Sequence, residues 1–261
     1  MPAGYSYKPP ELLLEELGVV EPADIDIEAI AEYCGATIVY ESLQGCDARI
    51  IGYGEKAIIT VKHTLRRERQ RFSGAHELGH WMCDRGNIAF SCTEKMFNED
   101  WFQNSKESRA NRYAADILLP KTMFRQHSKK REITFFTVKD LAEDFQTSFT
   151  TTAIRLVELG SYPAMIVCSK DGRRKWFTRG PDVSERIWPR DSIERGSVAF
   201  DILNGRSGDE GPVDVYANVW INHPDADQYE IREHSMRITS DLILSLLWWK
   251  DESQLLDLEN L

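Results

Sequence analysis

The sequence has few cysteines and no spacing that would use them as a framework. Its 261 residues include only 5 cysteines, and none of them stands in a CxxC pair. A disulfide-stapled fold needs an even set of cysteines, and a cysteine-based zinc site needs paired spacing, so both are excluded. We therefore expect free thiols and a cytoplasmic protein.

Long apolar runs and an excess of positive charge are also missing. The longest apolar stretch, residues 242–249, is far shorter than the roughly 20 residues that a membrane span needs. The 32 basic residues are outnumbered by 42 acidic ones, and this net charge of -10 disfavours a protein that coats phosphate backbones. We expect a globular protein that acts on a protein or peptide partner and does not contact a membrane.

The charge is distributed unevenly along the chain. Residues 1–62 hold 4 basic and 11 acidic residues, and residues 162–261 hold 12 and 18. Residues 63–161 hold 16 basic and 13 acidic residues, so the middle of the chain is the only positive part. The motifs described below lie in this middle part.

Apolar periodicity predicts an α+β fold with two groups of strands. In the first half, helices are expected near residues 11–17 and 24–35, before a small antiparallel sheet with strands at 37–43, 48–54 and 56–61. In the second half, a hairpin around Asp171-Gly172 precedes a helix near 191–204 and strands at 213–221, 229–238 and 241–249. A helix remains the alternative for the last of these strands.

The strongest signal is the segment His76-Glu77-Leu78-Gly79-His80. On a helix the two histidines lie one turn apart, about 40° around the axis, so both imidazoles reach one metal ion. Glu77 lies beside them, where it can take a proton from a water on the metal without binding the ion itself. Two ordinary half-buried histidines are the alternative, and a third ligand decides between the two hypotheses.

A carboxylate from a later helix is the third ligand that the sequence favours. The long metzincin pattern is excluded because Cys83 and Gly86 occupy the places of its glycine and third histidine. Glu107 opens ESRANRYAADILLP, a predicted helix whose alanines allow close approach to a neighbouring helix. Asn111 lies one turn further along the same face, where its amide is expected to hydrogen-bond a ligand imidazole. The competing carboxylates, which we expect to be solvated or capping groups, are Glu99, Asp100 and Asp116.

These residues resemble the ImmA/IrrE metallopeptidases of bacteria, their phages and mobile elements. HELGH and ESRANRYAADILLP match the two motifs of that family, and KAIITV before RRERQRF extends the resemblance over about residues 25–160. The resemblance implies a zincin-like fold in which His76, His80 and Glu107 bind Zn²⁺, or another divalent ion such as Mn²⁺. It also implies that Glu77 is the general base.

The resemblance further implies a class of substrate. Members of this family look like site-specific endopeptidases that inactivate a helix-turn-helix repressor and thereby derepress a mobile element or a stress regulon. Because only about 25 residues precede the matching region, the repressor is expected to be a separate protein. The rival hypothesis is a metal-stabilised adaptor or toxin–antitoxin component that binds a repressor without cutting it.

No motif identifies the group that stabilises the oxyanion. Tyr113 is the first candidate, with Tyr53 and His127 as alternatives, although packing or surface roles suit all three better. An extended substrate is expected to pair with an exposed sheet edge near residues 49–61.

Residues 138–145 and 149–159 are predicted to form a helix-turn-helix-like pair. The second helix, FTTTAIRLVEL, carries one arginine, too little for phosphate contacts and base readout, so we expect structural or repressor-docking use and no direct DNA binding. Three parts follow: a metallopeptidase domain (1–125), a helical extension (126–161) and an α+β regulatory or sensory domain (162–261). In the last part, NHPDADQ is interpreted as a polar turn and not as a second metal site.

Overall fold

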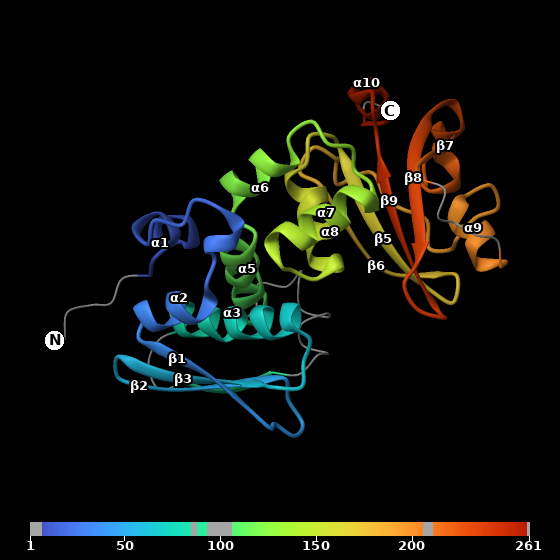
Figure 1. Cartoon of the computed structure of the whole chain (residues 1–261). Coiled ribbons are helices and arrows are strands. Elements are labelled where there is room, and N and C mark those ends of the chain that lie inside the picture. The colour runs from blue at the N-terminus through green and yellow to red at the C-terminus, as the bar shows by residue number, and fades with distance from the viewer. Residues whose placement is uncertain (1–6, 85–87, 93–105, 206–210, 260–261) are drawn as a thin grey trace. The chain divides into compact units, whose positions relative to one another are not determined.

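The computed structural model describes most of the chain, namely residues 7–84, 88–92, 106–205 and 211–259. The chain divides into two compact units, each of which combines a sheet with helices (Figure 1). The predicted α+β class is therefore confirmed. None of the helices in the described ranges has both the length and the apolar composition of a membrane span.

In the middle of the sequence the chain passes from unit 1 to unit 2, returns to unit 1 for a short stretch, and then continues in unit 2. Unit 1 comprises Met1–Phe124 and Ala142–Ser148, and unit 2 comprises Arg125–Leu141 and Phe149–Leu261. Helices α6 and α7 therefore contribute residues to both units. The predicted three-part division, with boundaries after residues 125 and 161, stays a prediction.

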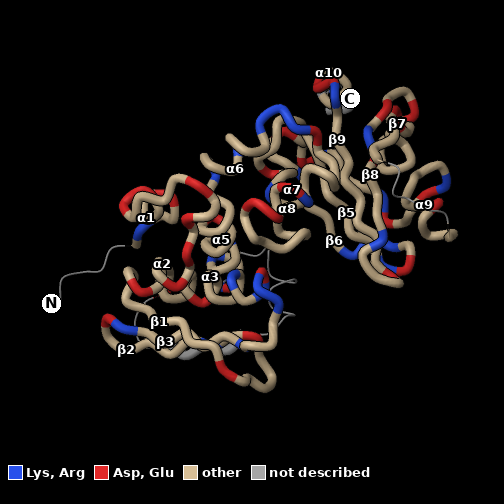
Figure 2. The backbone as a smooth tube through the Cα atoms, in the orientation of Figure 1, with Lys and Arg blue, Asp and Glu red and all other residues tan. Residues whose placement is uncertain are grey.

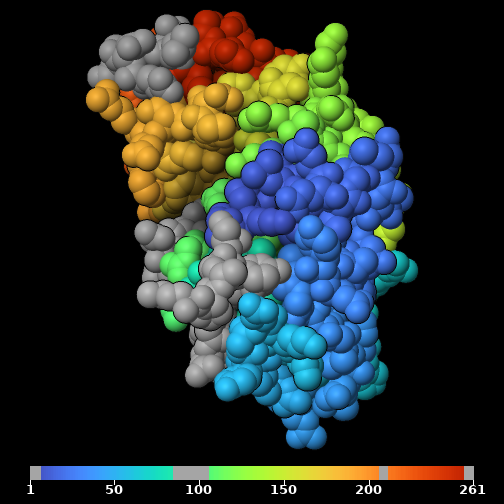
Figure 3. All heavy atoms as spheres, turned by 90° about the vertical axis from the view of Figure 1, so that its left-hand side faces the viewer, coloured from blue at the N-terminus to red at the C-terminus, as the bar shows by residue number. Residues whose placement is uncertain are grey.

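A four-stranded sheet and the helices packed on it form unit 1. Its elements are α1 (Pro10–Glu16), α2 (Ile27–Tyr33), β1 (Ala36–Glu41), β2 (Ala48–Tyr53), β3 (Lys56–Lys62), α3 (Arg67–Cys83), β4 (Ile88–Cys92) and α5 (Lys106–Leu118). The helices and strands that the sequence predicts in this half are confirmed, whereas β4 was not predicted. In Figure 3 the N-terminal helices and the strands, in shades of blue, form one face of this unit.

The sheet of unit 1 is mixed, whereas the sequence predicted an antiparallel sheet. The strand order is β1-β3-β2-β4, with β1 parallel to β3 and the other neighbours antiparallel. Because β2 and β3 form a hairpin around Gly54, β1 adds to the other side of β3 and runs parallel to it. Strands β2 and β3 are inner strands, so the expected substrate edge at residues 49–61 is wrong. The edges of the sheet are β1 and β4.

Helix α3 packs on one face of this sheet (Figure 1). Ile50 and Ile59 are buried, while the next residues along the strands, Ile51 and Ile58, are exposed. This period of two is that of a sheet covered on one side. Gly52 permits the close approach of the helix, because a Cβ at that position would lie 2.6 Å from the Trp81 ring. Helix α3 is therefore held against the sheet on one side, and it also carries the candidate site described below.

A five-stranded antiparallel sheet organises unit 2, in the order β6-β5-β9-β8-β7. Its strands are β5 (Ala164–Lys170), β6 (Arg173–Arg179), β7 (Val213–Tyr216), β8 (Glu230–Arg237) and β9 (Leu242–Trp248). The helices around or before it are α6 (Lys121–Ser128), α7 (Phe135–Phe145), α8 (Phe149–Leu159), α9 (Val198–Leu203) and α10 (Glu252–Glu259). A cluster of buried aliphatic and tryptophan side chains forms the core of this unit.

The hairpin predicted in unit 2 is confirmed, and two other expectations need correction. Asp171 and Gly172 both have positive φ angles, 50° and 77°, as a primed hairpin turn requires. The helix expected at 191–204 extends only over Val198–Leu203, because Ser197 caps it by accepting a hydrogen bond from the Phe200 amide at 3.1 Å. The strand expected at 213–221 ends at Tyr216 and continues as a 3₁₀ turn.

Two helices, α7 and α8, form where the sequence predicts a helix-turn-helix-like pair. The short connection between them passes through Gln146, whose φ of 52° lies in the left-handed region. Arg155, the arginine of α8, is 3% exposed and its Nη1 lies 3.4 Å from Glu158 Oε2. This side chain is buried in the unit, so it is not presented to a phosphate backbone.

Candidate metal centre

Helices α3 and α5 bring together the side chains that the motifs single out. His76, Glu77 and His80 lie in the C-terminal half of α3, and all three are 0% exposed. Glu107, in the first turn of α5, is 9% exposed. Burying this many polar side chains is costly unless they are paired or bind an ion. The burial of these four side chains therefore points to an ion at the centre.

Gly79 allows the two helices to approach closely at this point. A Cβ there would lie 2.8 Å from the carbonyl oxygen and 2.9 Å from the Cα of Ala110, and 3.1 Å from the Cβ of Tyr113. Backbone atoms of α5 cannot move away without shifting the helix. The glycine between the two histidines thus sets the distance between α3 and α5, and Ala110 provides the matching small side chain.

Three potential ligand atoms converge between the helices. His76 Nε2 and His80 Nε2 are 3.0 Å apart, and they lie 3.1 and 3.3 Å from the two carboxylate oxygens of Glu107. Ligand atoms at about 2.0–2.1 Å from one tetrahedral ion would be about 3.4 Å apart. The donor set of two imidazoles and one carboxylate and its spacing thus fit a divalent metal ion.

Electrostatics favour the metal-binding protonation states of these groups. Burial lowers the pKa of His76, which keeps the imidazole neutral, as a metal ligand must be. Burial also opposes ionisation of Glu107, but the two imidazoles beside its carboxylate outweigh burial and hold the Glu107 pKa well below its usual range. The centre therefore offers a neutral nitrogen ligand from His76 and a negative oxygen ligand from Glu107.

Asn111 orients the first imidazole. Its Oδ1 lies 2.9 Å from His76 Nδ1, and an amide oxygen only accepts hydrogen bonds. Nδ1 therefore carries the proton, and the lone pair of the neutral ring is on Nε2, which points to His80 and Glu107. The side chain is 1% exposed, so this contact is held within the packed interior.

Asp84 lies near the second imidazole without a hydrogen bond to it, and the sequence reasoning missed this residue. Its Oδ2 lies 3.8 Å from His80 Nδ1, and its Oδ1 accepts a hydrogen bond from Arg109 Nη2 at 2.7 Å. A carboxylate behind a metal-binding histidine orients the ring and raises its basicity. The signal was available, because Asp84 follows His80 by four residues and so lies on the same face of the helix.

Of the remaining candidates, Tyr113 lies at the contact between α3 and α5, and the others lie elsewhere or outside the described residues. Tyr113 is 2% exposed and packs edge-on against the Tyr7 ring, with centroids 6.3 Å apart, so its role at an oxyanion stays a prediction. Tyr53 is 82% exposed at the end of β2. His127 is half-buried in α6 and Asp116 half-buried in α5. Two of the competing carboxylates, Glu99 and Asp100, fall outside the described residues.

The fold and the centre together define a class of protein, an α+β domain with a potential metal site between two packed helices. Residues 31–157 match the model of the IrrE N-terminal-like domain, the Peptidase M78 family. This part of the chain is therefore similar to the ImmA/IrrE family, and the resemblance seen over residues 25–160 is confirmed. The family indicates a peptidase and implies a metal.

Solved structures also resemble the chain, but at low identity. A Mycobacterium tuberculosis transcriptional regulator matches with a TM-score of 0.55 and 14% identity, over 91% of this chain and 85% of that chain. At this identity the likeness shows the fold alone. No curated protein matches the sequence.

Proposed function

We propose that the protein is a zinc-dependent endopeptidase. The observation that carries the proposal is the convergence of His76 Nε2, His80 Nε2 and the Glu107 carboxylate at 3.0–3.3 Å, with the His76 tautomer set by Asn111. Three protein ligands leave a coordination position open for water, which is the arrangement of catalytic and not of structural zinc sites. Manganese suits the same donors and is the alternative ion.

The side chains of the chain have separate tasks in peptide hydrolysis. When bound, the ion supplies Lewis acidity and lowers the pKa of a water toward neutrality. Glu77 follows His76 on α3 and accepts the proton of the attacking water, then returns it to the leaving amine. Asn111 holds the His76 imidazole in the orientation that the ligand set requires, and the Asp84 carboxylate lies 3.8 Å behind the His80 ring.

The substrate that fits best is a separate helix-turn-helix repressor. The similarity of residues 31–157 to the ImmA/IrrE family supports a peptidase, and the resemblance of its motifs supports this class of target. The buried Arg155 argues against a DNA-contacting role for α8. The regulatory or sensory role of residues 162–261 and the cytoplasmic location belong to the same proposal.

Incubation with the helix-turn-helix repressor encoded by an adjacent gene tests this proposal. Wild type with zinc or manganese is expected to cut the repressor at one site, read by intact mass. Glu77→Gln removes the proton acceptor without removing a ligand, so metal content is retained and the cleavage rate falls at least about 100-fold. Glu68→Gln, an exposed glutamate in the first turn of the same helix, is the matched control and should cut normally.

Two results would contradict the proposal. Full cleavage by the Glu77→Gln variant would remove the assigned general base. Metal-loaded wild type that binds the repressor and leaves it intact would favour the non-cleaving adaptor or toxin–antitoxin component.

A further inference from the structure

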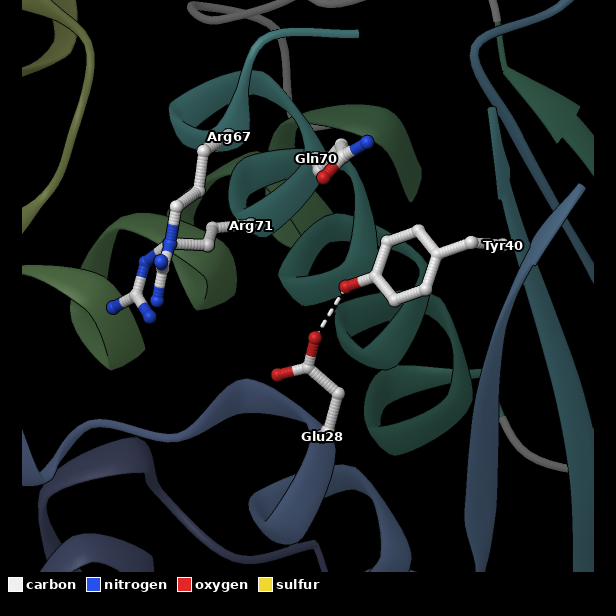
Figure 4. A pocket seen from close by; sticks show the side chains of 5 residues that line it. All are labelled: Glu28, Tyr40, Arg67, Gln70 and Arg71. Carbon is white, nitrogen blue, oxygen red and sulfur yellow. Dashed lines mark hydrogen bonds between the residues drawn. The ribbon is translucent and has the colours of Figure 1, made fainter. Parts of the chain in front are cut away.

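A second polar site lies at the other end of helix α3. A pocket of about 300 Å³ opens between α2, β1 and the first turns of α3, and its five lining residues are Glu28, Tyr40, Arg67, Gln70 and Arg71 (Figure 4). Small-molecule sites begin at about this volume, in the range of roughly 300–1,000 Å³. Figure 2 shows basic residues gathered at this start of α3 and acidic ones along α1 and before α2.

This pocket is separate from the candidate metal centre. Arg67 and Arg71 are one turn apart, whereas His76 lies about 140° around the helix from Arg71 at 100° per residue. The arginines face α2 and β1, and the histidines face α5. The hydrolytic reaction uses none of the five lining residues, so the pocket needs its own explanation.

Arg71 is a buried charged side chain whose hydrogen bonds are only partly satisfied. Its side chain is only 8% exposed, its Nη1 donates to the Ile25 carbonyl at 3.0 Å, and its buried Nε has no hydrogen-bond partner among the described residues. A buried donor without an acceptor destabilises the folded protein. Burial lowers the pKa of this guanidinium, the nearby Glu28 carboxylate opposes that shift, and the positive charge of Arg67 adds to it.

The acid in the pocket does not neutralise the two arginines directly. Glu28 accepts a hydrogen bond from the Tyr40 hydroxyl, as the dashed line in Figure 4 marks. Within the described part of the chain, no ion pair of 4.0 Å or less joins Glu28 to Arg67 or Arg71. Two adjacent guanidinium groups therefore line the cavity without a paired carboxylate.

We propose that this pocket binds a phosphate group, either free phosphate or a phosphate monoester. Arg67 and Arg71 supply forked donors that match phosphate oxygens. The start of a 17-residue helix contributes partial positive charge on the same side. A bound phosphate relieves the repulsion between the guanidinium groups. Glu28 then faces the remaining part of the ligand, where it accepts a hydrogen bond from a hydroxyl.

Equilibrium dialysis of the full-length, metal-loaded protein against radiolabelled inorganic phosphate, at constant ionic strength, tests the site. Wild type should bind one phosphate per chain saturably. Arg67→Gln should weaken binding at least about tenfold, because a charge-assisted contact is lost. The matched control is Arg66→Gln, which removes the same charge from the preceding, exposed residue that does not line the pocket, and should bind as wild type does. Far-ultraviolet circular dichroism and zinc content should be the same in all three proteins.

The outcomes separate this site from the metal centre. Binding that survives in Arg67→Gln, as binding to the metal ion would, overturns the proposal, and so does the absence of saturable binding to wild type. Competition by glycerol 3-phosphate distinguishes the two sources of the group. Tighter binding of the monoester assigns the rest of the cavity to an organic moiety, and equal affinity assigns the site to free phosphate. The repressor-cleavage assay does not enter this test, so the endopeptidase proposal stands or falls separately.

Discussion

Two buried glutamates, one in each unit, have different partners and pKa shifts in opposite directions. Glu233 in unit 2 is 0% exposed, and its carboxylate accepts hydrogen bonds from the Val198 and Ala199 amides at 3.0 and 2.8 Å and from Ser235 Oγ at 2.6 Å. Glu107 in unit 1 is nearly as buried, but its carboxylate faces two imidazole nitrogens. Burial raises the pKa of Glu233, whereas the histidines hold that of Glu107 well below its usual range.

The difference shows how a structural carboxylate is told from a candidate ligand. Around Glu233 the partners are donors with hydrogens of their own, including the amides at the start of α9, so the hydrogen bonds explain the burial. Around Glu107 the partners are imidazoles, and the one held by Asn111 presents a lone pair. A cation between these atoms satisfies all three groups at once. Burial alone does not mark a functional site, but the type of partner does.

Replacing each glutamate by glutamine should give the largest effects, on zinc affinity for Glu107 and on the free energy of unfolding for Glu233. Glu107→Gln removes the negative ligand, so zinc affinity should fall by more than the roughly 10–100-fold that loss of an outer contact costs. Glu233→Gln should leave zinc affinity unchanged but lower the free energy of unfolding of unit 2 by about 1–3 kcal/mol, because an amide group then opposes amide donors.

Competition with a chromogenic chelator measures the first effect and denaturant unfolding the second. Equal zinc affinity in Glu107→Gln and wild type would remove the distinction between the two carboxylates.

The contacts behind the two histidines should give an intermediate effect. Asn111→Ala removes a 2.9 Å hydrogen bond to His76, and zinc affinity should fall about 10–100-fold. Asp84→Asn weakens a longer contact, 3.8 Å from His80, and should cost less than Asn111→Ala. The same chelator competition ranks the variants, and a larger loss in Asp84→Asn would reverse the assigned order.

The smallest effect concerns pH and the raised pKa of Glu233. A carboxyl group whose folded pKa lies above the unfolded value of 4.5 contributes stability that is present below pH 4.5 and is lost as the pH rises through the folded pKa. The difference in free energy of unfolding between wild type and Glu233→Gln should therefore become smaller as the pH rises through the folded pKa. Denaturant unfolding at a series of pH values checks this, and a difference that grows with pH would contradict the burial argument.

The sequence predicted which residues come together at the centre better than it predicted how the strands of the sheet pair. Helical periodicity places His76 and His80 on one face, and the same rule places Asn111 one turn beyond Glu107, so local spacing was sufficient for these residues. Asp84 follows the same rule but belongs to no catalytic motif, and its contact with Arg109 depends on the packing of two helices.

Pairing between strands depends on distant parts of the chain, which local patterns do not contain. The strand sequences predicted β1, β2 and β3, but the parallel pairing of β1 with β3 follows from the space that the β2–β3 hairpin leaves free. The shortened α9 has a similar origin. Ser197 and Glu233 together fix its first turn, and Glu233 comes from a strand more than thirty residues later.

X-ray absorption at the zinc edge tests the central claim most directly. The account predicts one zinc per chain with two imidazole nitrogens and a carboxylate oxygen at about 2.0–2.2 Å and no sulfur ligand. Cys83, half-buried three residues after His80, is the nearest thiol along α3, and burial raises its pKa to about 11, so it is expected to stay out of the ligand set. A shell at about 2.3 Å from sulfur, or protein that holds no zinc, would contradict the account.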